Sequence, residues 1–291
     1  MQVDFFEDAD SFLAVAADYL AADPIRLSVI ATNAVRAQVM PREAVDWPRW
    51  FATVRAEGVL CGVAMRTHPA ETHPAWIGPM PPDAVTALAA ALIDRGEAIA
   101  AMTGSLPEVA DFAALMARAV GGRVEQQVPT RLWALSQVQW PAEPAGRLRE
   151  ATAADAGTLL PLLLTFIPQA AAQAGRPVHP GERFTTTEQD IVDQIAAGRR
   201  YLLWEVDGRI AHVTGINVPA FGSARIAPVL TPEPFRGNGY AAWVVATAAQ
   251  RILDAGLLPC LYTDVTNPVS NGVYARIGFE PLGESGEYSV A

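Results

Sequence analysis

The stretch Arg236-Gly237-Asn238-Gly239-Tyr240-Ala241 follows a β-rich run at residues 224–231 and opens an apolar stretch that ends at Asp254. Gly237 and Gly239 have no Cβ, so the backbone can adopt positive φ here and several N–H groups can converge on one anion. A helix that begins after Gly239 adds the unpaired amides and the positive dipole end of its first turn. The stretch therefore predicts a pyrophosphate-binding turn between a strand and a helix.

Two other phosphate-binding motifs contain similar glycines, and neither fits. A Rossmann motif requires Gly-x-Gly-x-x-Gly with an acidic residue about 20 residues later, and the third glycine is missing here. A P-loop requires Gly-Lys-Ser or Gly-Lys-Thr, and the sequence contains no lysine. An ordinary glycine turn before a helix remains the alternative at this point.

The residues downstream predict a second strand, turn and helix. The apolar run at residues 257–265 is typical of a strand, and Asn267-Pro268-Val269-Ser270-Asn271 breaks it before a short helix. Tyr274 follows Asn267 by seven residues, and Ile277-Gly278-Phe279 places a glycine at the helix end. Glycine is the residue that most often stops a helix.

Taken together, the glycine turn, Asn267, Asn271, Tyr274 and the Ile-Gly-Phe ending resemble the acyl-CoA site of the GNAT superfamily of N-acetyltransferases. The family turn reads Gln or Arg, two residues, Gly, one residue, then Gly or Ala, and Arg236, Gly239 and Ala241 occupy its fixed positions. The resemblance implies acetyl-CoA as the acyl donor. It implies a cofactor site made of Val229, Leu230, Thr231, Arg236, Gly237, Asn238, Gly239, Tyr240, Ala241, Ala242, Asn267 and Asn271.

The resemblance also implies direct attack by an amine, without a covalent enzyme intermediate. In the family, pantetheine pairs like an added strand with the residues that correspond to 229–231, and a bulge frees a backbone N–H for the thioester oxygen. Pro228 suits such a bulge, because proline in a sheet is confined to bulges and edges. The nearest amide is then that of Val229, and an ordinary edge strand is the alternative.

Tyr274 is the expected general acid. A phenol of pKa about 10 can protonate a thiolate whose acid has a pKa of about 8.5 only if it is well placed. The family places a tyrosine hydroxyl at the thioester sulfur, and Tyr274 stands at that position. Packing of the short helix onto the sheet is its alternative role.

The general base is not identified by the sequence. Family members often use a Glu on the strand at residues 257–265, or a water chain, and this chain has Tyr262 at the corresponding place. The candidates are Asp264, Glu233, His212 and Glu205, each of which also suits a solvated or structural role. Asp264 is preferred because it ends the strand that faces the cofactor.

Domain organisation is indicated by a proline-rich segment at residues 138–147, which places a boundary between residues 141 and 142. Residues 142–291 then read as strand, helices, three strands, helix, strand, helix and closing strands. Thr186 and Gln189 predict a capping box, and Asp207-Gly208 predicts a hairpin turn. The expected fold is α/β, with tandem GNAT-like domains, each a mixed and mostly antiparallel sheet flanked by helices.

Residues 1–141 contain a diverged copy of the same order. Asp94 and Asp254, like Thr103 and Thr263, are separated by 160 residues, and each half has an alanine-rich helix, a glycine and a strand there. Where the second half has its glycine turn, the first has Gly78-Pro79-Met80-Pro81-Pro82. Proline lacks the backbone N–H, so we expect the first half to bind no cofactor.

Composition excludes several classes of protein. A formal charge of −10 argues against nucleic acid as a partner and is compatible with a cationic amine. No stretch approaches the roughly 18 apolar residues of a membrane span, and the N-terminus is acidic where a signal peptide is basic. Two cysteines, Cys61 and Cys260, and four histidines lie in no metal-binding spacing. We expect a cytoplasmic protein without a metal, either a monomer or a homodimer.

The expected function is N-acetylation of a small-molecule or peptide amine by acetyl-CoA. A tandem acetyltransferase of the mycothiol synthase kind is an alternative of the same class, and a non-catalytic acyl-CoA-binding module is one of a different class. Trp47, Trp50 and Phe51 are interpreted as core anchors, with an acceptor pocket as the alternative. Arg225 is interpreted as a surface charge, with a phosphate contact as the alternative.

Overall fold

Two compact units make up the chain. The computed structural model describes residues 1–291 except 40–48, 68–73, 180–181 and 183–185. The first unit contains Met1–Arg131 with Gly283–Ala291, and the second contains Leu132–Leu282. The expected boundary between residues 141 and 142 therefore falls inside the second unit, and the end of the chain belongs to the first. Strand pairing joins residues far apart in the sequence, so a proline-rich segment does not reveal which unit the last strand belongs to.

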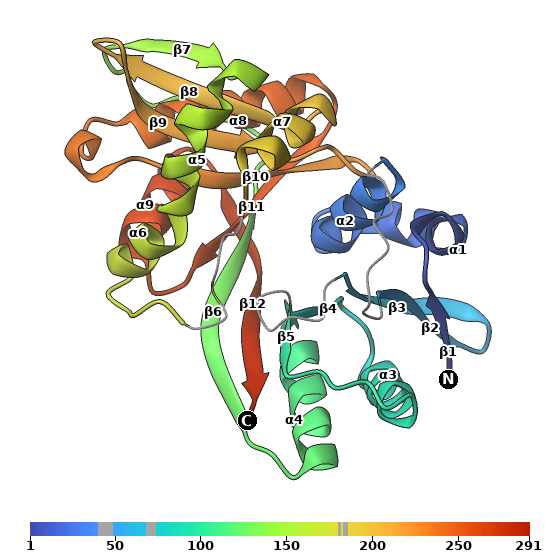
Figure 1. Ribbon diagram of the computed structural model, residues 1–291. Helices are drawn as coiled ribbons and strands as arrows, with labels where there is room; N and C mark the ends of the chain where they lie inside the picture. Colours follow the sequence, from blue (N-terminus) through green and yellow to red (C-terminus); the bar gives the residue numbers. More distant parts are fainter. Residues whose placement is uncertain (40–48, 68–73, 180–181, 183–185) are drawn as a thin grey trace. The chain divides into compact units, whose positions relative to one another are not determined.

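The first unit contains one mixed sheet (Figure 1). Its strands are β1 (Gln2–Phe6), β2 (Trp50–Ala56), β3 (Val59–Arg66), β4 (Ala75–Ile77), β5 (Ala101–Ser105) and parts of β6 (Val124–Ala134) and β12 (Glu280–Val290), and its helices are α1 (Ala9–Ala22), α2 (Ser28–Val39), α3 (Pro82–Asp94) and α4 (Glu108–Val120). The strand order is β1-β2-β3-β4-β5-β12-β6. β4 and β5 are parallel, whereas β1 to β4 and the β5–β12 pair are antiparallel.

Aromatic residues of β2 anchor the core of the first unit, as the sequence predicted for Trp50 and Phe51. Both are buried. The Phe51 ring stacks on Phe12 with a centroid distance of 4.8 Å, and the Trp50 ring meets Phe5 edge-on at 5.8 Å. Such contacts add to the free energy of burying the rings themselves. Trp47 lies outside the described residues.

The second unit also contains a mixed sheet. Its strands are β7 (Arg147–Glu150), β8 (Arg200–Val206), β9 (Arg209–Ile216), β10 (Ser223–Leu230) and β11 (Leu258–Asp264), and its α-helices are α5 (Ala156–Leu164), α6 (Phe166–Gln173), α7 (Glu188–Ala196), α8 (Tyr240–Asp254) and α9 (Pro268–Arg276). The order is β6-β11-β10-β9-β8-β7, with the end of β6 beside β11. β7 to β10 are antiparallel, and β10 is parallel to β11.

Turn and cap residues explain where the elements of the second unit begin. Asp207 and Gly208 form the β8–β9 hairpin turn with φ of 48° and 73°, as predicted. The capping box of α7 is one residue later than expected. Thr187 accepts from the backbone of Asp190, and the Asp190 carboxylate accepts from the backbone of Thr187. Aspartate closes this box, where the prediction had relied on Gln189.

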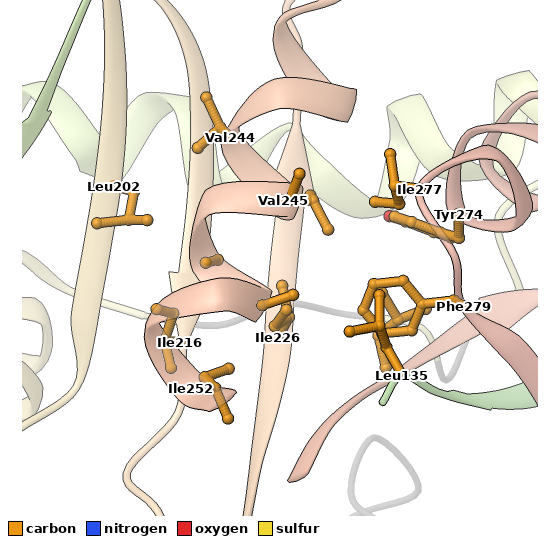
Figure 2. Packing of buried hydrophobic residues seen from close by; sticks show 14 of the residues in the cluster. Leu135, Leu202, Ile216, Ile226, Val244, Val245, Ile252, Tyr274, Ile277 and Phe279 are labelled. Atoms are coloured by element: carbon orange, nitrogen blue, oxygen red, sulfur yellow. The ribbon is translucent and has the colours of Figure 1, made fainter. Parts of the chain in front are cut away.

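Helices cover both faces of the second sheet. On one face, α8 and α9 pack against β8 to β11 through a cluster that includes Val245, Ile226 and Phe279 (Figure 2). On the other face, α5 and α7 pack against Leu203 and Val213. A sheet with both faces covered requires apolar residues at successive positions, which is what β8 shows.

The internal repeat predicted from the sequence is confirmed in the order of elements. Helices α3 and α8 end at Asp94 and Asp254, and helices α4 and α9 begin at Glu108 and Pro268, so both pairs keep the offset of 160 residues. In each unit the strand before the first of these helices is parallel to the strand after it. The two units therefore share one topology.

Within the described residues, no helix is long and apolar enough to cross a bilayer. No group of three His, Cys, Asp or Glu side chains among them is arranged to hold a metal ion.

Candidate active site

β10 and β11 separate along their length, and this opens the sheet of the second unit. In the described chain their parallel pairing covers Ser223–Arg225 with Leu258–Cys260 and goes no further, although the two strands continue to Leu230 and Asp264. Unpaired backbone groups of a parallel pair are available to an extended ligand. Cys260 and Arg225 therefore mark the closed end of a split between two strands.

A β-bulge at Ala227-Pro228 accompanies the split. β10 pairs with β9 through Ile226 and Ile216, and next through Val229 and Thr214, so β10 has one residue more than its partner between these two pairs. The bulge predicted at Pro228 is thus confirmed. β10 lies between β9 and β11, so Pro228 does not mark an edge strand.

Two residues that the sequence analysis missed accommodate the bulge. The Arg199 guanidinium donates to the Ala227 carbonyl at 2.8 Å and replaces the ladder bond that the bulge removes. Gly215 on β9 lies against the same carbonyl, so closely that a Cβ there would clash with the Ala227 oxygen. A glycine inside a strand is the sequence signal for such a close approach.

We expect Gly215→Ala to disrupt the bulge and weaken acyl-CoA binding by about tenfold or more, since a backbone oxygen must move by a large fraction of an atomic radius. Calorimetric titration with acetyl-CoA measures the effect. Gly283→Ala is the matched control, because it also adds a methyl group to a strand glycine, and nothing lies within 4 Å of its Cβ. Equal affinity in both variants would show that the bulge does not shape the cofactor site.

The glycine turn has the geometry that its sequence predicts. Gly237 and Gly239 both have φ of 81°, and Gly239 is the N-cap of α8 without a side-chain capping bond. Residues 237–239 are exposed, and nothing lies within 4 Å of a Cβ placed on either glycine. In the described structure the amides of residues 237–242 donate to no protein acceptor. The turn presents free N–H groups at a helix N-terminus, which suits an anion.

Two side chains of the turn itself, those of Asn238 and Arg236, hold its backbone in place. Asn238 donates to the carbonyl oxygens of Phe235 and Arg236 at 3.0 and 3.2 Å. Arg236 donates to the Thr231 carbonyl and to the Gln169 side chain of α6. Both side chains therefore hold the loop, and the backbone of the loop is what faces outward.

The other predicted cofactor contacts on β10 and α8 can offer a ligand their backbone groups, because several of their side chains pack in the core. The Tyr240 ring is buried 6.3 Å from the Trp204 ring, so its amide, and not its side chain, lies at the turn. Leu230 is buried and Val229 packs on the α8 cluster. Ala241 and Ala242 are half-buried in the first turn of α8.

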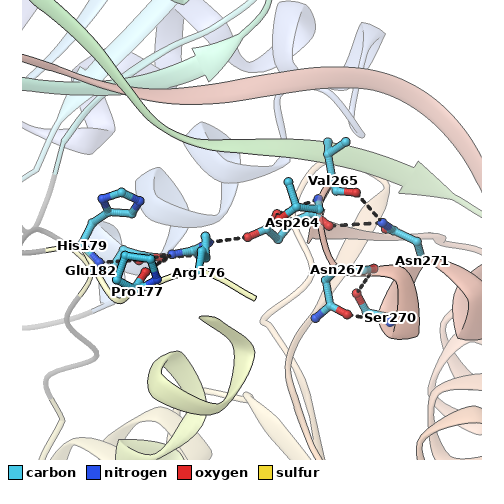
Figure 3. Close-up of polar contacts among 10 residues, drawn as sticks. Arg176, Pro177, His179, Glu182, Asp264, Val265, Asn267, Ser270 and Asn271 are labelled. Carbon is cyan, nitrogen blue, oxygen red and sulfur yellow. Dashed lines mark hydrogen bonds and ion pairs between the residues drawn. The ribbon is translucent and has the colours of Figure 1, made fainter. Parts of the chain in front are cut away.

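The two predicted asparagines differ in what they leave for a ligand (Figure 3). Asn267 caps α9, with its side-chain oxygen accepting from the amides of Val269 and Ser270, both at 3.1 Å. Its side-chain nitrogen donates to no described residue. Asn271 is fully engaged, because it accepts from Thr263 and donates to the carbonyls of residues 264 and 265. The structure thus gives Asn271 the role of holding the end of β11 onto α9.

Tyr274 lies on α9 with its ring in the core (Figure 2). It is 7% exposed, and its ring centroid is 6.0 Å from that of Phe279. Its hydroxyl bonds to no described residue. Burial raises the pKa of Tyr274 well above its ordinary value, so the phenol stays protonated at any physiological pH. The side chain is therefore a proton donor and not a base, and it also packs the helix.

The preferred base, Asp264, is an ion-pair partner instead (Figure 3). Arg176 donates to Asp264 at 2.6 Å and to both oxygens of Glu182 at 2.6 and 2.7 Å. Burial raises the pKa of Asp264, but the bonds from Thr266 and Arg176 outweigh it, and the net shift is downward. A carboxylate with a lowered pKa is a poor acceptor for an amine proton.

We therefore expect Asp264→Asn to keep the shape of the pH–rate profile between about pH 6 and 9, because the carboxylate is already ionised throughout that range. A drop of less than about tenfold in kcat/KM is expected from the loosened Arg176. Glu205→Gln, which also removes an arginine-paired carboxylate, is the control. A loss confined to Asp264→Asn and recovered at high pH would restore Asp264 as the base.

The other three candidates for the general base are also unsuited to that role or are not shown to have it. His212 is fully buried between the hydroxyls of Thr231 and Thr214, at 2.7 and 2.6 Å, and burial lowers its pKa to about 3. Bonds from Arg147 and Arg149 lower the pKa of Glu205. Glu233 is exposed in the short turn before the glycines. No described side chain is assigned as the base.

The matching turn of the first unit is closed by its own side chains. The Gly78 Cα faces the Val63 carbonyl and Leu27, and Met80 is buried against Gly62. Pro81 is the N-cap of α3 and makes no side-chain capping bond. This contrast with the open glycines of the second unit supports the expectation that only one of the two turns receives an anion.

A split parallel strand pair, a bulge and an open glycine turn before a helix define the second unit as a GNAT-type fold, and the repeat makes it a tandem one. Residues 213–288 match the family model described as FR47-like protein. A search of curated proteins found no match. The sequence resemblance to the GNAT superfamily and the predicted fold class are thus both supported.

Solved structures show the same fold over the whole chain. A Drosophila protein aligns with a TM-score of 0.66 and 14% identity, covering 99% of this chain and 98% of its own. A tandem GNAT protein from the clavulanic acid biosynthesis pathway aligns with a TM-score of 0.58 and 16% identity, covering 100% and 98%. A GNAT-family acetyltransferase from Colwellia psychrerythraea aligns with a TM-score of 0.53 and 13% identity, covering 100% of this chain and 99% of its own.

Proposed function

We propose that this protein is an acyl-CoA-dependent N-acetyltransferase that moves an acetyl group from acetyl-CoA to a primary amine. The observation that carries the proposal is the continuity of one binding path in the second unit. It begins at the exposed amides after Gly237 and runs along β10 past Val229 to the split that closes at Arg225 and Cys260. Such a path suits a molecule with an anionic end and an extended, hydrogen-bonding arm.

The residues present fit acetyl-CoA by their donor chemistry. The amides of residues 237–242 and the dipole of α8 would hold the pyrophosphate, and the free backbone groups of β10 with the Asn267 amide nitrogen would hold the pantetheine. When bound, the cofactor supplies an activated thioester. We propose that the Val229 N–H at the bulge would donate to the thioester oxygen as negative charge develops there, because donors fixed in advance lower the barrier most.

Tyr274 is proposed to protonate the departing sulfur. Its raised pKa keeps the phenol protonated before the reaction. The thiolate is the weaker base, so the transfer depends on the Tyr274 hydroxyl lying next to the departing sulfur. The amine must arrive unprotonated, and since Asp264 and His212 are unsuited, we propose that water at the open split accepts its proton. No protein nucleophile is needed for this chemistry.

A non-catalytic acyl-CoA-binding module is the second candidate, because Tyr274 is 7% exposed and packs in the core. The two functions are distinguished by a coenzyme A thiol-release assay on the full chain with a panel of polyamines, aminoglycosides, amino acids and peptides. Amine-dependent release supports the transferase. Acetyl-CoA binding without release on any amine supports the binding module. A cysteinyl acceptor of the mycothiol type belongs in the same panel, because tandem units are present here.

A further inference from the structure

Arg225 occupies the closed end of the split on the side away from α8. Its neighbours Ala224 and Ile226 both pack in the core cluster beneath α8. Successive side chains of a strand point to opposite faces of the sheet, so the Arg225 side chain points to the face away from α8. Cys260 and Tyr262 of β11 lie near enough to influence its charge. Helices α5 and α6 contact β10. The guanidinium therefore lies beside the last paired residues of β10 and β11.

The Arg225 side chain is half-buried and has no counter-charge among the described residues. Its Nη1 atom is inaccessible to solvent and has no hydrogen-bond partner, and no carboxylate among the described residues pairs with it. Burial lowers the pKa of Arg225 below its ordinary value. The Asn217 backbone and side chain both donate to the Arg225 carbonyl, at 2.9 and 3.1 Å, and this fixes the residue in place. The sequence-based interpretation of Arg225 as a surface charge is correct only in part, because the side chain is half-buried.

An Nη1 atom that is inaccessible to solvent and lacks an acceptor is costly, so an anion that accepts a hydrogen bond from it would be stabilising. Other arginines of this unit show the usual arrangement. Arg149 pairs with Asp155 and Glu205, and Arg176 pairs with Glu182 and Asp264. Arg225 differs from these two arginines because it lies on β10 at the closed end of the split and pairs with no carboxylate of the described chain.

The cofactor does not supply this anion. The glycine turn lies beyond the far end of β10, whose last residue is Leu230, so the pyrophosphate is separated from Arg225 by at least five strand residues, about 16 Å. The Val229 amide, where the thioester oxygen is proposed to lie, is nearer, at four residues or about 13 Å. An anion at Arg225 therefore enters on the acceptor.

We propose that Arg225 binds a carboxylate of the acceptor, so that the substrate is an amine that carries a carboxylate several bonds away from it, such as an ω-amino acid or a peptide. The inference rests on the proposed acetyl transfer. A single planar guanidinium matches one carboxylate through two parallel bonds.

The test uses sets of three amines that differ only at the end remote from the amine: an ω-amino acid, its amide and the corresponding alkylamine. Wild-type enzyme is expected to acetylate the amino acid with kcat/KM about 10- to 100-fold above its amide, through a lower KM. Arg225→Gln should abolish that preference, with kcat/KM for the amino acid falling to the value for its amide. Arg225→Lys, which keeps the charge without the fork, should retain part of it. Equal activity of the wild-type enzyme on all three amines of a set would overturn the proposal.

A binding measurement separates this proposal from the proposed function. With acetyl-CoA replaced by a non-hydrolysable analogue, ω-amino acids but not their amides should raise the Tm of wild-type protein and not of Arg225→Gln. If no amine is acetylated but this shift is present, acetyl transfer fails and the carboxylate site stands. If Arg225→Gln does not fold, Arg225→Lys provides the comparison. Equal shifts with the acid and the amide contradict the site.

Discussion

Gly239→Val is expected to lower the affinity for acetyl-CoA by about 10²-fold or more. Valine at φ of 81° is strained, and its side chain would occupy the open space into which the amides of the turn point. Losing two charge-assisted bonds of about 1.5–3 kcal/mol each accounts for a fall of that size. Calorimetric titration of the purified variant measures it.

The control for Gly239→Val is Gly256→Val. Gly256 follows the other end of α8, also has positive φ, 72°, and also has nothing within 4 Å of an added Cβ. It therefore carries the same backbone strain without the anion site. Gly237→Asp, which adds a negative charge beside the pyrophosphate, should weaken binding as well. If both turn variants fold and bind like the Gly256→Val control, the turn is not the anion site.

Tyr274→Phe should reduce kcat by about 10²-fold, the usual range for removing a general acid, with acetyl-CoA affinity nearly unchanged. The phenylalanine ring would still fill the core cluster between α9 and the sheet, because only the hydroxyl is deleted. That hydroxyl bonds to no described residue. Single-turnover kinetics, where chemistry limits the rate, are the appropriate measurement.

Tyr288→Phe is the matched control for this prediction, because Tyr288 is another buried tyrosine, in the first unit, at 8% exposure. It should leave turnover unchanged. Full turnover by Tyr274→Phe would assign Tyr274 to packing alone, which is the role its burial already shows.

Features set by local sequence were predicted well. The positive φ at Gly237 and Gly239, the hairpin at Asp207-Gly208 and the bulge at Pro228 each follow from what one or two residues allow or forbid. The internal offset was recognised because both halves keep the same spacing between the end of one helix, at Asp94 or Asp254, and the start of the next, at Glu108 or Pro268. The α7 cap was misplaced by one residue because Thr186 and Thr187 both satisfy the capping pattern, and the pairing with Asp190 decides between them.

Features set by distant residues were not predicted. Asp264 was preferred as the base from its place on β11, but its partner Arg176 is 88 positions away and follows α6. Gly215 has a role only because β9 and β10 approach each other at Ala227. Arg225 was taken for a surface charge because nothing in its neighbours shows that the chain covers part of its side chain. The assignment of the last strand to the first unit depends likewise on its pairing with β5.

The central claim is that the glycine turn of the second unit, and not the proline-filled turn of the first, holds acetyl-CoA. Calorimetric titration of the full chain with acetyl-CoA tests it most directly, since stoichiometry counts the functional turns. We predict one site per chain in the wild type, weakened by Gly239→Val and unaffected by Gly256→Val. Two sites per chain, or one site that Gly239→Val leaves unchanged, would contradict the account.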